Sequence, residues 1–323
     1  MTPGHRDRAA DVFDPELRAA LAVVGGVFPP TITPGLIPFM RRSYASPPRD
    51  ELLRGHDVEI EDFDYPGYGG AAIAGSIIRP AGARPSAVIL SFHSGGMMFG
   101  DRFSGVDLAL DWVARLRVGL VTVDYRLAPE HPHPTPFEDC YASLVWLAAH
   151  ARELGFDPER VLIAGASAGG GLAAAVALAA RERGGPRAVG QLLDYPMLDD
   201  RGVTDSTRRF DGVGVWDRVS NETGWNALLG DAVGGGTVSP YAAPARAETL
   251  AGLPPAYLDV GAAEIFRDET VDYAQRIWRD GGDAELHVWP GAFHACDIFA
   301  RHTGIARAMI ETRLRWLRRR LED

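Results

Sequence analysis

Apolar residues recur along the chain in short continuous runs separated by stretches of helical periodicity. The strand-like runs are "SAVILSFH", "VGLVTVDY", "RVLIAGAS", "AVGQLLDYP", "PAYLDVGA" and "AELHVWPG". The helical stretches lie near residues 106–116, 136–154, 171–184 and 266–282, and a last one runs to the C-terminus. Short apolar strands that alternate with amphipathic helices are typical of a parallel sheet covered on both faces. We therefore predict a doubly wound α/β sheet.

Three segments depart from this alternation. Residues 1–45 contain short helical pieces broken by "FPPTITPG", whose prolines forbid one continuous helix. Residues 56–80 hold two strand-like segments, which we predict to pair antiparallel. Residues 198–247 show no clear strand, and long insertions of this kind are often lids or binding elements. We predict a catalytic domain over residues 46–323, with N-terminal cap helices over 1–45 and a cap insertion at about 198–247.

Composition narrows the class of protein and its partners. The 323 residues are 46% hydrophobic and 24% charged, which suffices for one large core. A formal net charge of −10 argues against nucleic acid as a partner. The basic cluster "RLRWLRRR", residues 313–320, has helical spacing and is interpreted as the solvated face of a C-terminal helix, with a binding patch as the alternative.

The cellular location of the protein is predicted from three features that the sequence lacks. The two cysteines, Cys140 and Cys296, are too few for a disulfide framework, and no apolar run is long enough to cross a bilayer. The N-terminal residues lack the apolar core of a signal peptide. We therefore predict a cytoplasmic protein without a membrane partner. A homodimer remains open as an alternative to a monomer.

The most informative motif is Gly165-Ala166-Ser167-Ala168-Gly169, a G-x-S-x-G sequence between an apolar strand and a predicted helix. Small residues around the serine allow a sharp turn that exposes its hydroxyl, and the helix N-terminus behind it favours negative charge. The motif alone could be a structural turn. In this strand-turn-helix context we interpret Ser167 as a nucleophile.

A nucleophilic serine needs a base and an acid, which follow it along the chain in this kind of fold. Of the downstream histidines, His287 lies within a strand-like run and His302 within the final helical region, whereas His294 follows a strand and a glycine-containing loop. His294 is therefore the predicted base.

The candidate acids lie on and after the strand-like run "PAYLDVG". Asp259 falls within the strand, and Asp268 and Glu269 fall in the first turn of a helix, where acids commonly serve as caps. Glu264 comes directly after the strand end and is the predicted acid by position.

Adjacent glycines after an earlier strand complete the constellation. When a serine attacks an acyl group, the carbonyl oxygen of that group becomes an oxyanion. Preorganised backbone N–H groups must stabilise it. Gly95 and Gly96, in "SFHSGGMMFG", can supply two donors, and Ala168, the residue after the nucleophile, a third. Without Ser167 and His294, the glycine pair would be read as a simple tight turn.

These motifs together resemble the hormone-sensitive-lipase family of α/β-hydrolases, over about residues 86–299. The matching pieces, in the family's order, are "HSGGMMFG", "DYRLAPEHPHPTPFEDC", "GASAGG", "YPMLDD", "EIFRDE" and "GAFHACDIF". The resemblance implies a mostly parallel eight-stranded sheet with helices on both faces, a helical cap, and neither a metal nor an organic cofactor. Three residues depart from the family's commonest choices. Ser94 stands where the family usually has Gly, Ala166 where it has Asp or Thr, and Glu264 where it most often has Asp.

The sequence thus predicts a cofactor-independent serine carboxylesterase acting on small-molecule esters with short to medium acyl chains. The candidate substrate-binding residues, which lie beside the oxyanion loop or in the predicted cap, are Met97, Met98, Phe99, Phe210, Trp216 and Trp225. Two alternatives remain. The same residues could hydrolyse amide or N-acetyl groups, or the scaffold could bind a small molecule without turnover, although a binding protein has no need of His294.

Overall fold

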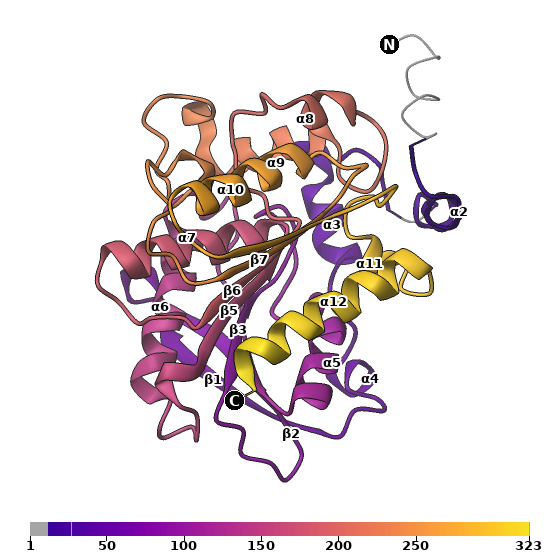
Figure 1. The fold of residues 1–323 in the computed structure, drawn as a ribbon. Helices are drawn as coiled ribbons and strands as arrows, with labels where there is room; N and C mark the ends of the chain where they lie inside the picture. The colour runs from indigo at the N-terminus through magenta and orange to yellow at the C-terminus, as the bar shows by residue number, and fades with distance from the viewer. Residues whose placement is uncertain (1–11, 27, 323) are drawn as a thin grey trace.

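An eight-stranded sheet forms the centre of the computed structural model, which describes residues 12–26 and 28–322 (Figure 1). The strands are β1 (Val58–Pro66), β2 (Ala72–Pro80), β3 (Val88–Phe92), β4 (Gly119–Val123), β5 (Val161–Ala166), β6 (Gly190–Asp194), β7 (Ala256–Gly261) and β8 (Ala284–Trp289). Their order across the sheet is β1-β2-β4-β3-β5-β6-β7-β8. The pairs β1–β2 and β2–β4 are antiparallel, and every other neighbouring pair is parallel. The predicted α/β class and the antiparallel pair over residues 56–80 are confirmed.

Helices cover both faces of this sheet. In chain order, the helices of the described residues are α2 (Pro15–Val24), α3 (Ile37–Ser43), α4 (Arg49–Leu52), α5 (Val106–Leu116), α6 (Thr135–His150), α7 (Ala168–Glu182), α8 (Asp205–Arg209), α9 (Arg218–Leu229), α10 (Arg267–Arg279), α11 (Cys296–Phe299) and α12 (Gly304–Leu321). Short 3₁₀ turns lie at Pro34–Leu36, Tyr68–Gly70, Pro158–Arg160, Gly230–Ala232 and Pro244–Arg246. None of the helices in the described part of the chain is both long and apolar enough to cross a membrane.

The central strands β3 to β7 bury both of their faces, because successive side chains point to opposite sides and helices cover each side. Along β5, Val161 and Ile163 belong to the core shared with α6, α7 and α10, whereas Leu162 and Ala164 belong to the core shared with α5 and α12. This explains why the sequence shows continuous apolar runs rather than alternation. The two cores fix the carboxyl ends of the parallel strands, from which the site is built.

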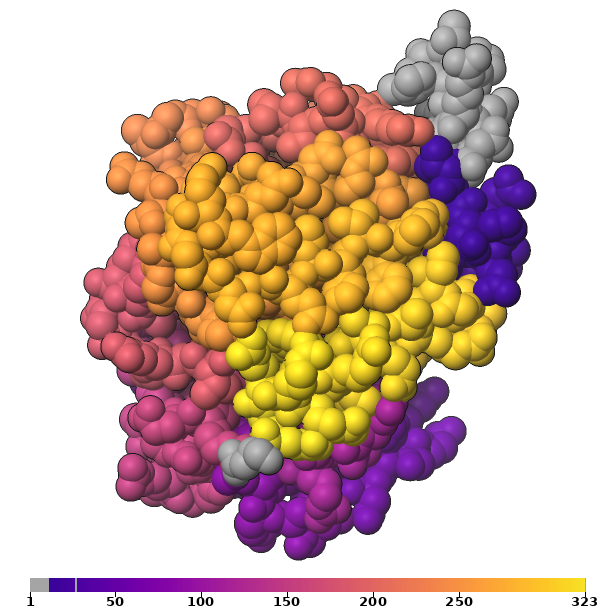
Figure 2. Space-filling model, in the orientation of Figure 1, coloured from indigo at the N-terminus to yellow at the C-terminus, as the bar shows by residue number. Residues whose placement is uncertain are grey.

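Residues 198–247 contain the helices α8 and α9 joined by long loops, and lie with α3 at one end of the sheet (Figure 1). Two hydrogen bonds join this segment to the N-terminal part: Thr31 Oγ1 donates to Asp217 Oδ2 at 2.7 Å, and the Ile32 N–H donates to Ser220 Oγ at 2.8 Å. Figure 2 shows α2 at the surface against the C-terminal part of the chain, where the Gly304 N–H donates to Glu16 Oε2 at 3.0 Å. Residues 1–11 of the predicted N-terminal cap lie outside the described part.

The basic cluster of residues 313–320 is only partly solvated, which corrects the prediction of a solvated face. Arg315, Arg318 and Arg319 are exposed along α12, as expected. Arg313, in contrast, is 2% exposed and faces the sheet. Its position on the apolar side, next to Leu314 and three residues before Trp316, is the helical-spacing signal that could have identified it.

Candidate active site

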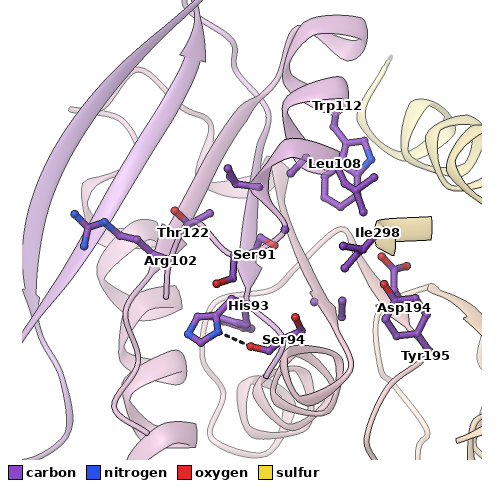
Figure 3. Close-up of a pocket in the computed structure, with 17 residues that line it drawn as sticks. Ser91, His93, Ser94, Arg102, Leu108, Trp112, Thr122, Asp194, Tyr195 and Ile298 are labelled. Carbon is purple, nitrogen blue, oxygen red and sulfur yellow. Dashed lines mark hydrogen bonds between the residues drawn. The ribbon is translucent and has the colours of Figure 1, made fainter. Parts of the chain in front are cut away.

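Ser167 occupies the sharp turn between β5 and α7. Its backbone has φ 57° and ψ −118°, a combination that non-glycine residues rarely adopt and that surrounding contacts must hold. The Ser167 N–H donates to the Asp194 carbonyl at 2.9 Å. A Cβ on Gly165 would lie 2.1 Å from the Gly169 carbonyl oxygen, so this turn requires the small residues of the motif. On the side of the turn, Ala166 lines a cavity of about 40 Å³, which is separate from the pocket at Ser167 described below (Figure 3).

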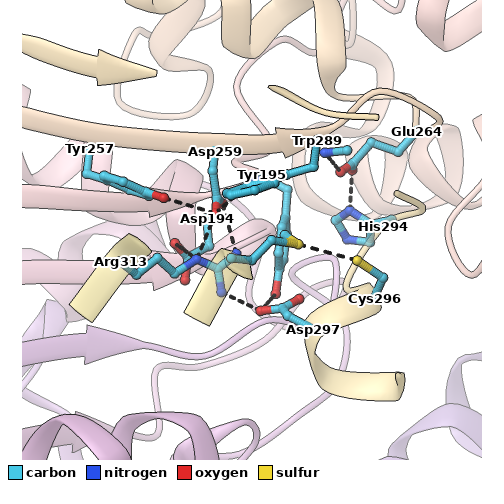
Figure 4. Close-up of polar contacts among 12 residues, drawn as sticks. Asp194, Tyr195, Tyr257, Asp259, Glu264, Trp289, His294, Cys296, Asp297 and Arg313 are labelled. Atoms are coloured by element: carbon cyan, nitrogen blue, oxygen red, sulfur yellow. Dashed lines mark hydrogen bonds and ion pairs between the residues drawn. The ribbon is translucent and has the colours of Figure 1, made fainter. Parts of the chain in front are cut away.

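Three side chains from separate loops form a hydrogen-bonded chain. The Nε2 atom of His294 lies 3.0 Å from Ser167 Oγ, and its Nδ1 atom lies 2.5 Å from Glu264 Oε2. The second oxygen of Glu264 accepts the Gly261 N–H at 2.8 Å, which fixes the carboxylate at the end of β7. All three side chains are buried (Figure 4 shows the Glu264–His294 pair). This arrangement allows a proton to move from the serine hydroxyl to the imidazole while the carboxylate faces the opposite nitrogen.

Burial raises the pKa of Glu264, while the adjacent His294 and the Gly261 N–H act in the opposite direction. The imidazole is also fixed by rings on two sides. Tyr195 meets it edge-on with ring centroids 4.8 Å apart, and Phe266 does so at 5.2 Å. His294 therefore has little freedom to rotate away from Ser167.

The other candidate acids contact different groups. Asp268 accepts the Ser206 N–H at 2.7 Å and Glu269 accepts the Leu198 N–H at 2.7 Å, so both fix the start of the 198–247 segment. Asp259 lies within β7, as predicted, and pairs with Arg313.

The other two histidines lie away from the serine. His287, on β8, lies 2.9 Å from Glu285, and His302 is exposed in the turn before α12. The prediction that His302 lies within the last helix is wrong, because Thr303 caps that helix and Gly304 begins it. His294 is thus the histidine of these three that the fold brings to Ser167.

Backbone N–H groups converge next to the serine. Those of Gly95, Gly96 and Ala168 donate to no acceptor among the described residues, and both glycines line the same pocket as Ser167. Gly96 has φ 58°, and a Cβ there would lie 2.1 Å from the ring of Trp216. The glycine therefore lets an aromatic side chain of the 198–247 segment cover the oxyanion loop.

The N-terminal part of the chain holds this loop from the other side. We call residues 41–46 the clamp, because three of their side chains bind residues 94–101. The bonds are Arg41 Nε to Met98 O at 2.9 Å, Tyr44 OH with Ser94 Oγ at 2.9 Å, and Ser46 Oγ to Asp101 Oδ1 at 2.7 Å. Sequence reasoning missed the clamp, since no local motif links residues so far apart. Ser94, where the resembling family has glycine, was the one available signal.

A narrow pocket of about 30 Å³ opens at the serine. Its lining residues are Phe28, Tyr44, Ser94, Gly95, Gly96, Phe99, Ser167, Tyr195, Val215, Trp216, His294, Ala295 and Phe299. The aromatic rings contact one another, as in the edge-on pair of Tyr44 and Phe99 at 5.3 Å. No lysine, arginine, aspartate or glutamate is among these residues, so the pocket suits an uncharged group.

The predicted substrate-binding residues divide into two groups. Phe99 and Trp216 line the pocket. The other four, Met97, Met98, Phe210 and Trp225, are at most 2% exposed, lie in the core around it and are not among the lining residues. Met97 and Met98 follow the glycine pair in a turn whose carbonyls accept bonds from Ala128 and Arg41, and this turn directs their side chains into the core.

Comparisons with known proteins identify the family of this chain. A family model described as the alpha/beta hydrolase fold matches residues 89–298. Esterase LipI of Mycobacterium tuberculosis is 36% identical over 71% of this chain and 71% of its own length. Carboxylesterase NlhH of the same species is 32% identical over 90% of this chain and 91% of its own. The solved structure of a bacterial heroin esterase superposes with a TM-score of 0.88 at 35% identity, covering 97% of this chain and 99% of that one.

The chain belongs to the hormone-sensitive-lipase family of α/β-hydrolases. The resemblance identified from the sequence is therefore confirmed, as is the eight-stranded, mostly parallel sheet that it implied. In this chain a serine, a histidine and a carboxylate lie in hydrogen-bond contact, and the carboxylate is that of a glutamate.

Proposed function

We propose that this carboxylic ester hydrolase of the hormone-sensitive-lipase family cleaves small esters with short to medium acyl chains, through a covalent acyl-enzyme on Ser167. The observation that carries the proposal is the continuous path from Glu264 through His294 to Ser167, which ends at a pocket beside three unpaired N–H groups. The names of the relatives, which are esterases, support the same bond type.

The first half-reaction transfers the acyl group to the enzyme. Ser167 Oγ attacks the acyl carbon and its proton passes to His294 Nε2, 3.0 Å away. The carbonyl oxygen becomes an oxyanion, which the N–H groups of Gly95, Gly96 and Ala168 stabilise together with the N-terminus of α7. His294 then gives the proton to the departing alcohol oxygen as the ester bond breaks.

The second half-reaction uses water. His294 removes a proton from a water molecule, whose oxygen attacks the acyl carbon of the acyl-enzyme. The intermediate collapses as His294 returns the proton to Ser167 Oγ, and the carboxylic acid leaves. Glu264 stabilises the imidazolium in both steps, since Oε2 lies 2.5 Å from Nδ1. Every step uses protein groups and water, so the proposal involves no metal or organic cofactor.

The walls of the pocket support a limit on acyl length. Phe99 and Trp216 stand 6.3 Å apart, measured between ring centroids, and Trp216 lies directly over Gly96. A long acyl chain would have to pass these two rings, so we expect a short acyl group to fit with less rearrangement than a long one.

The same proposal includes a cytoplasmic location. Cys140 and Cys296 are both free thiols and both buried, which suits a reducing compartment. We expect soluble small molecules as the substrates.

A serine-dependent burst tests the proposed function. p-Nitrophenyl acetate should give a rapid release of nitrophenol equal to the enzyme concentration, followed by slower turnover. Ser167→Ala should abolish both phases while keeping the wild-type melting temperature, and a phosphonate ester should label Ser167 alone. Turnover of p-nitroacetanilide at a rate similar to that of the ester would instead indicate an amidase, and activity in Ser167→Ala would contradict the nucleophile.

A further inference from the structure

A single buried arginine on α12 binds three buried carboxylates behind the site. Arg313 Nη2 lies 2.8 Å from Asp259 Oδ1, Nε lies 3.0 Å from Asp194 Oδ1, and Nη1 donates to Asp297 Oδ2 (Figure 4). All four side chains are at most 6% exposed. Such a concentration of buried charge is costly unless each group is well paired, so its presence beside the site needs an explanation.

Each carboxylate belongs to a segment that carries one part of the catalytic chain. Asp194 ends β6, and its carbonyl oxygen accepts the Ser167 N–H at 2.9 Å. Asp259 lies on β7, the strand that leads directly into the loop of Glu264. Asp297 follows His294 by three residues, in the first turn of α11. One guanidinium therefore ties together the three segments that must stay in register for proton transfer.

Tyr195 connects this cluster to the imidazole itself. Its hydroxyl donates to Asp297 Oδ2 at 3.3 Å and its N–H donates to the Asp259 carbonyl at 2.7 Å. Its ring meets His294 edge-on, at 74°. The backbone of Tyr195 has φ 37°, a left-handed conformation that a tyrosine keeps only when its surroundings fix it.

We propose that Arg313 is a positioning residue for the reaction, acting through Asp297 and Tyr195 on the orientation of His294 toward Ser167. This inference rests on the proposed function. A guanidinium suits the task because its planar fork can bind several carboxylates at fixed angles, whereas an ammonium is a point charge without directional preference. Replacing Arg313 by lysine would thus keep the positive charge of the cluster but lose the fixed geometry of its contacts.

The test compares Arg313→Lys with Arg315→Lys, a matched control on the same helix whose side chain is exposed. Wild type and both variants are assayed with p-nitrophenyl acetate at one temperature, which lies 20 °C below the lowest of their melting temperatures. Lower stability then does not reduce the folded fraction. We expect kcat of Arg313→Lys to fall about tenfold with KM unchanged within about twofold, because orientation affects the transition state more than binding. The control should match wild type.

A spectroscopic measurement separates positioning from support of the fold. The short Glu264–His294 hydrogen bond should give a far-downfield proton resonance, assigned by its loss in Glu264→Gln. In Arg313→Lys this resonance should broaden, since a less ordered imidazole exchanges its proton faster. A purely structural role would lower the melting temperature and leave both kcat and the resonance unchanged, which would overturn the inference.

A second variant decides the matter if Arg313→Lys does not fold. Asp297→Asn keeps the shape and an acceptor for Tyr195 but removes one charged contact, and we expect kcat to fall about fivefold with the same broadening. A kcat within twofold of wild type would refute the positioning role. Wild-type protein without a Ser167-dependent burst would instead refute the proposed function, so the two failures are distinguishable.

Discussion

Glu264 contacts the imidazole of His294 with a side chain one methylene longer than aspartate. Its backbone lies just beyond β7, and the Gly261 N–H holds its second oxygen at 2.8 Å. The position of the carboxylate is therefore set from two directions, by a backbone donor and by the histidine. Reach and charge both matter at this residue, and they can be varied separately.

Substitutions at Glu264 should lose activity in a defined order. In Glu264→Asp the charge stays but the carboxylate withdraws, so we expect kcat to fall by between roughly tenfold and a hundredfold. Glu264→Gln keeps the length but no longer stabilises the imidazolium, and its kcat should fall by about 10²- to 10⁴-fold. Steady-state kinetics with p-nitrophenyl acetate measure both.

Asp268→Asn is the matched control, since Asp268 is also an acid of the same segment but binds the Ser206 N–H and Arg267 instead. We expect it to lose at most about 1 kcal/mol of stability in a thermal melt while keeping wild-type kcat. An inactive but folded Asp268→Asn, together with an active Glu264→Gln, would assign the acid to Asp268.

At the scale of elements, the oxyanion loop is held between two segments that are distant from it in sequence. The clamp binds it through Arg41, Tyr44 and Ser46, and Trp216 packs against Gly96 on the other side. The proposed oxyanion donors, Gly95 and Gly96, thus depend on contacts that the loops of Ser167, Glu264 and His294 do not make.

The bond between Tyr44 and Ser94 should be visible as an energetic coupling. Tyr44→Phe and Ser94→Ala each leave one hydroxyl without its partner, and each should lower the free energy of unfolding by about 1 kcal/mol. The double variant should be destabilised by less than the sum, with an interaction free energy of roughly 0.5–1.5 kcal/mol. Urea denaturation of all four proteins measures this cycle, and strict additivity would show that the bond contributes nothing.

Trp216 should set the limit on acyl length. Trp216→Ala removes the wall over Gly96, so we expect kcat/KM for p-nitrophenyl octanoate to rise relative to that for the acetate by about tenfold or more. The matched control is Trp225→Phe, a tryptophan of the same segment that does not line the pocket. An unchanged chain-length profile in Trp216→Ala would place the acyl group elsewhere.

Much of this arrangement could be predicted because its signals are local. The strand-turn-helix context of Ser167 and the positions of Glu264 and His294 after strands are visible in short windows of sequence. The clamp and the Arg313 cluster are not, because they join residues separated by tens to hundreds of positions. The burial of Met97 and Met98 beside the pocket could not be predicted for a related reason, since the direction of a side chain after a glycine pair depends on the φ angles of the turn.

At the scale of the whole molecule, the Arg313 cluster contains more carboxyl groups than cations. Three ionised carboxylates and one guanidinium would leave two uncompensated charges in the interior. Asp194 has the fewest contacts, since its Oδ1 lies near Arg313 but makes no hydrogen bond among the described residues. Burial raises the pKa of Asp194 well above its ordinary value, with Asp259 and Asp297 acting in the same direction and Arg313 against it. Burial also raises the pKa of Asp259, but Asp259 accepts two hydrogen bonds from Arg313, so we expect Asp194 to be the member of the cluster that retains a proton.

Asp194→Asn should stabilise the protein at alkaline pH. The raised pKa means that folded Asp194 holds a proton that the unfolded chain releases above about pH 4, so its contribution to stability falls as pH rises from there toward the folded-state pKa. Asparagine removes this loss, and we expect roughly 1 kcal/mol more stability than wild type at pH 8, shrinking to near zero at pH 4. Thermal melts across this range measure it. Destabilisation at pH 8 would mean that Asp194 is ionised and paired.

Because Arg313 lies on the last helix, the chain needs its C-terminal residues in order to fold stably. A chain that stops before residue 304 still contains Ser167, Glu264 and His294, but it also contains Asp194, Asp259 and Asp297 without their cation. Loss of α12 would also uncover the apolar face of the sheet that Leu314, Trp316 and Leu317 cover, so we expect proteases to cut the shortened chain before it can persist as a folded enzyme. Prematurely terminated copies should therefore be degraded, and the cell would accumulate only full-length hydrolase.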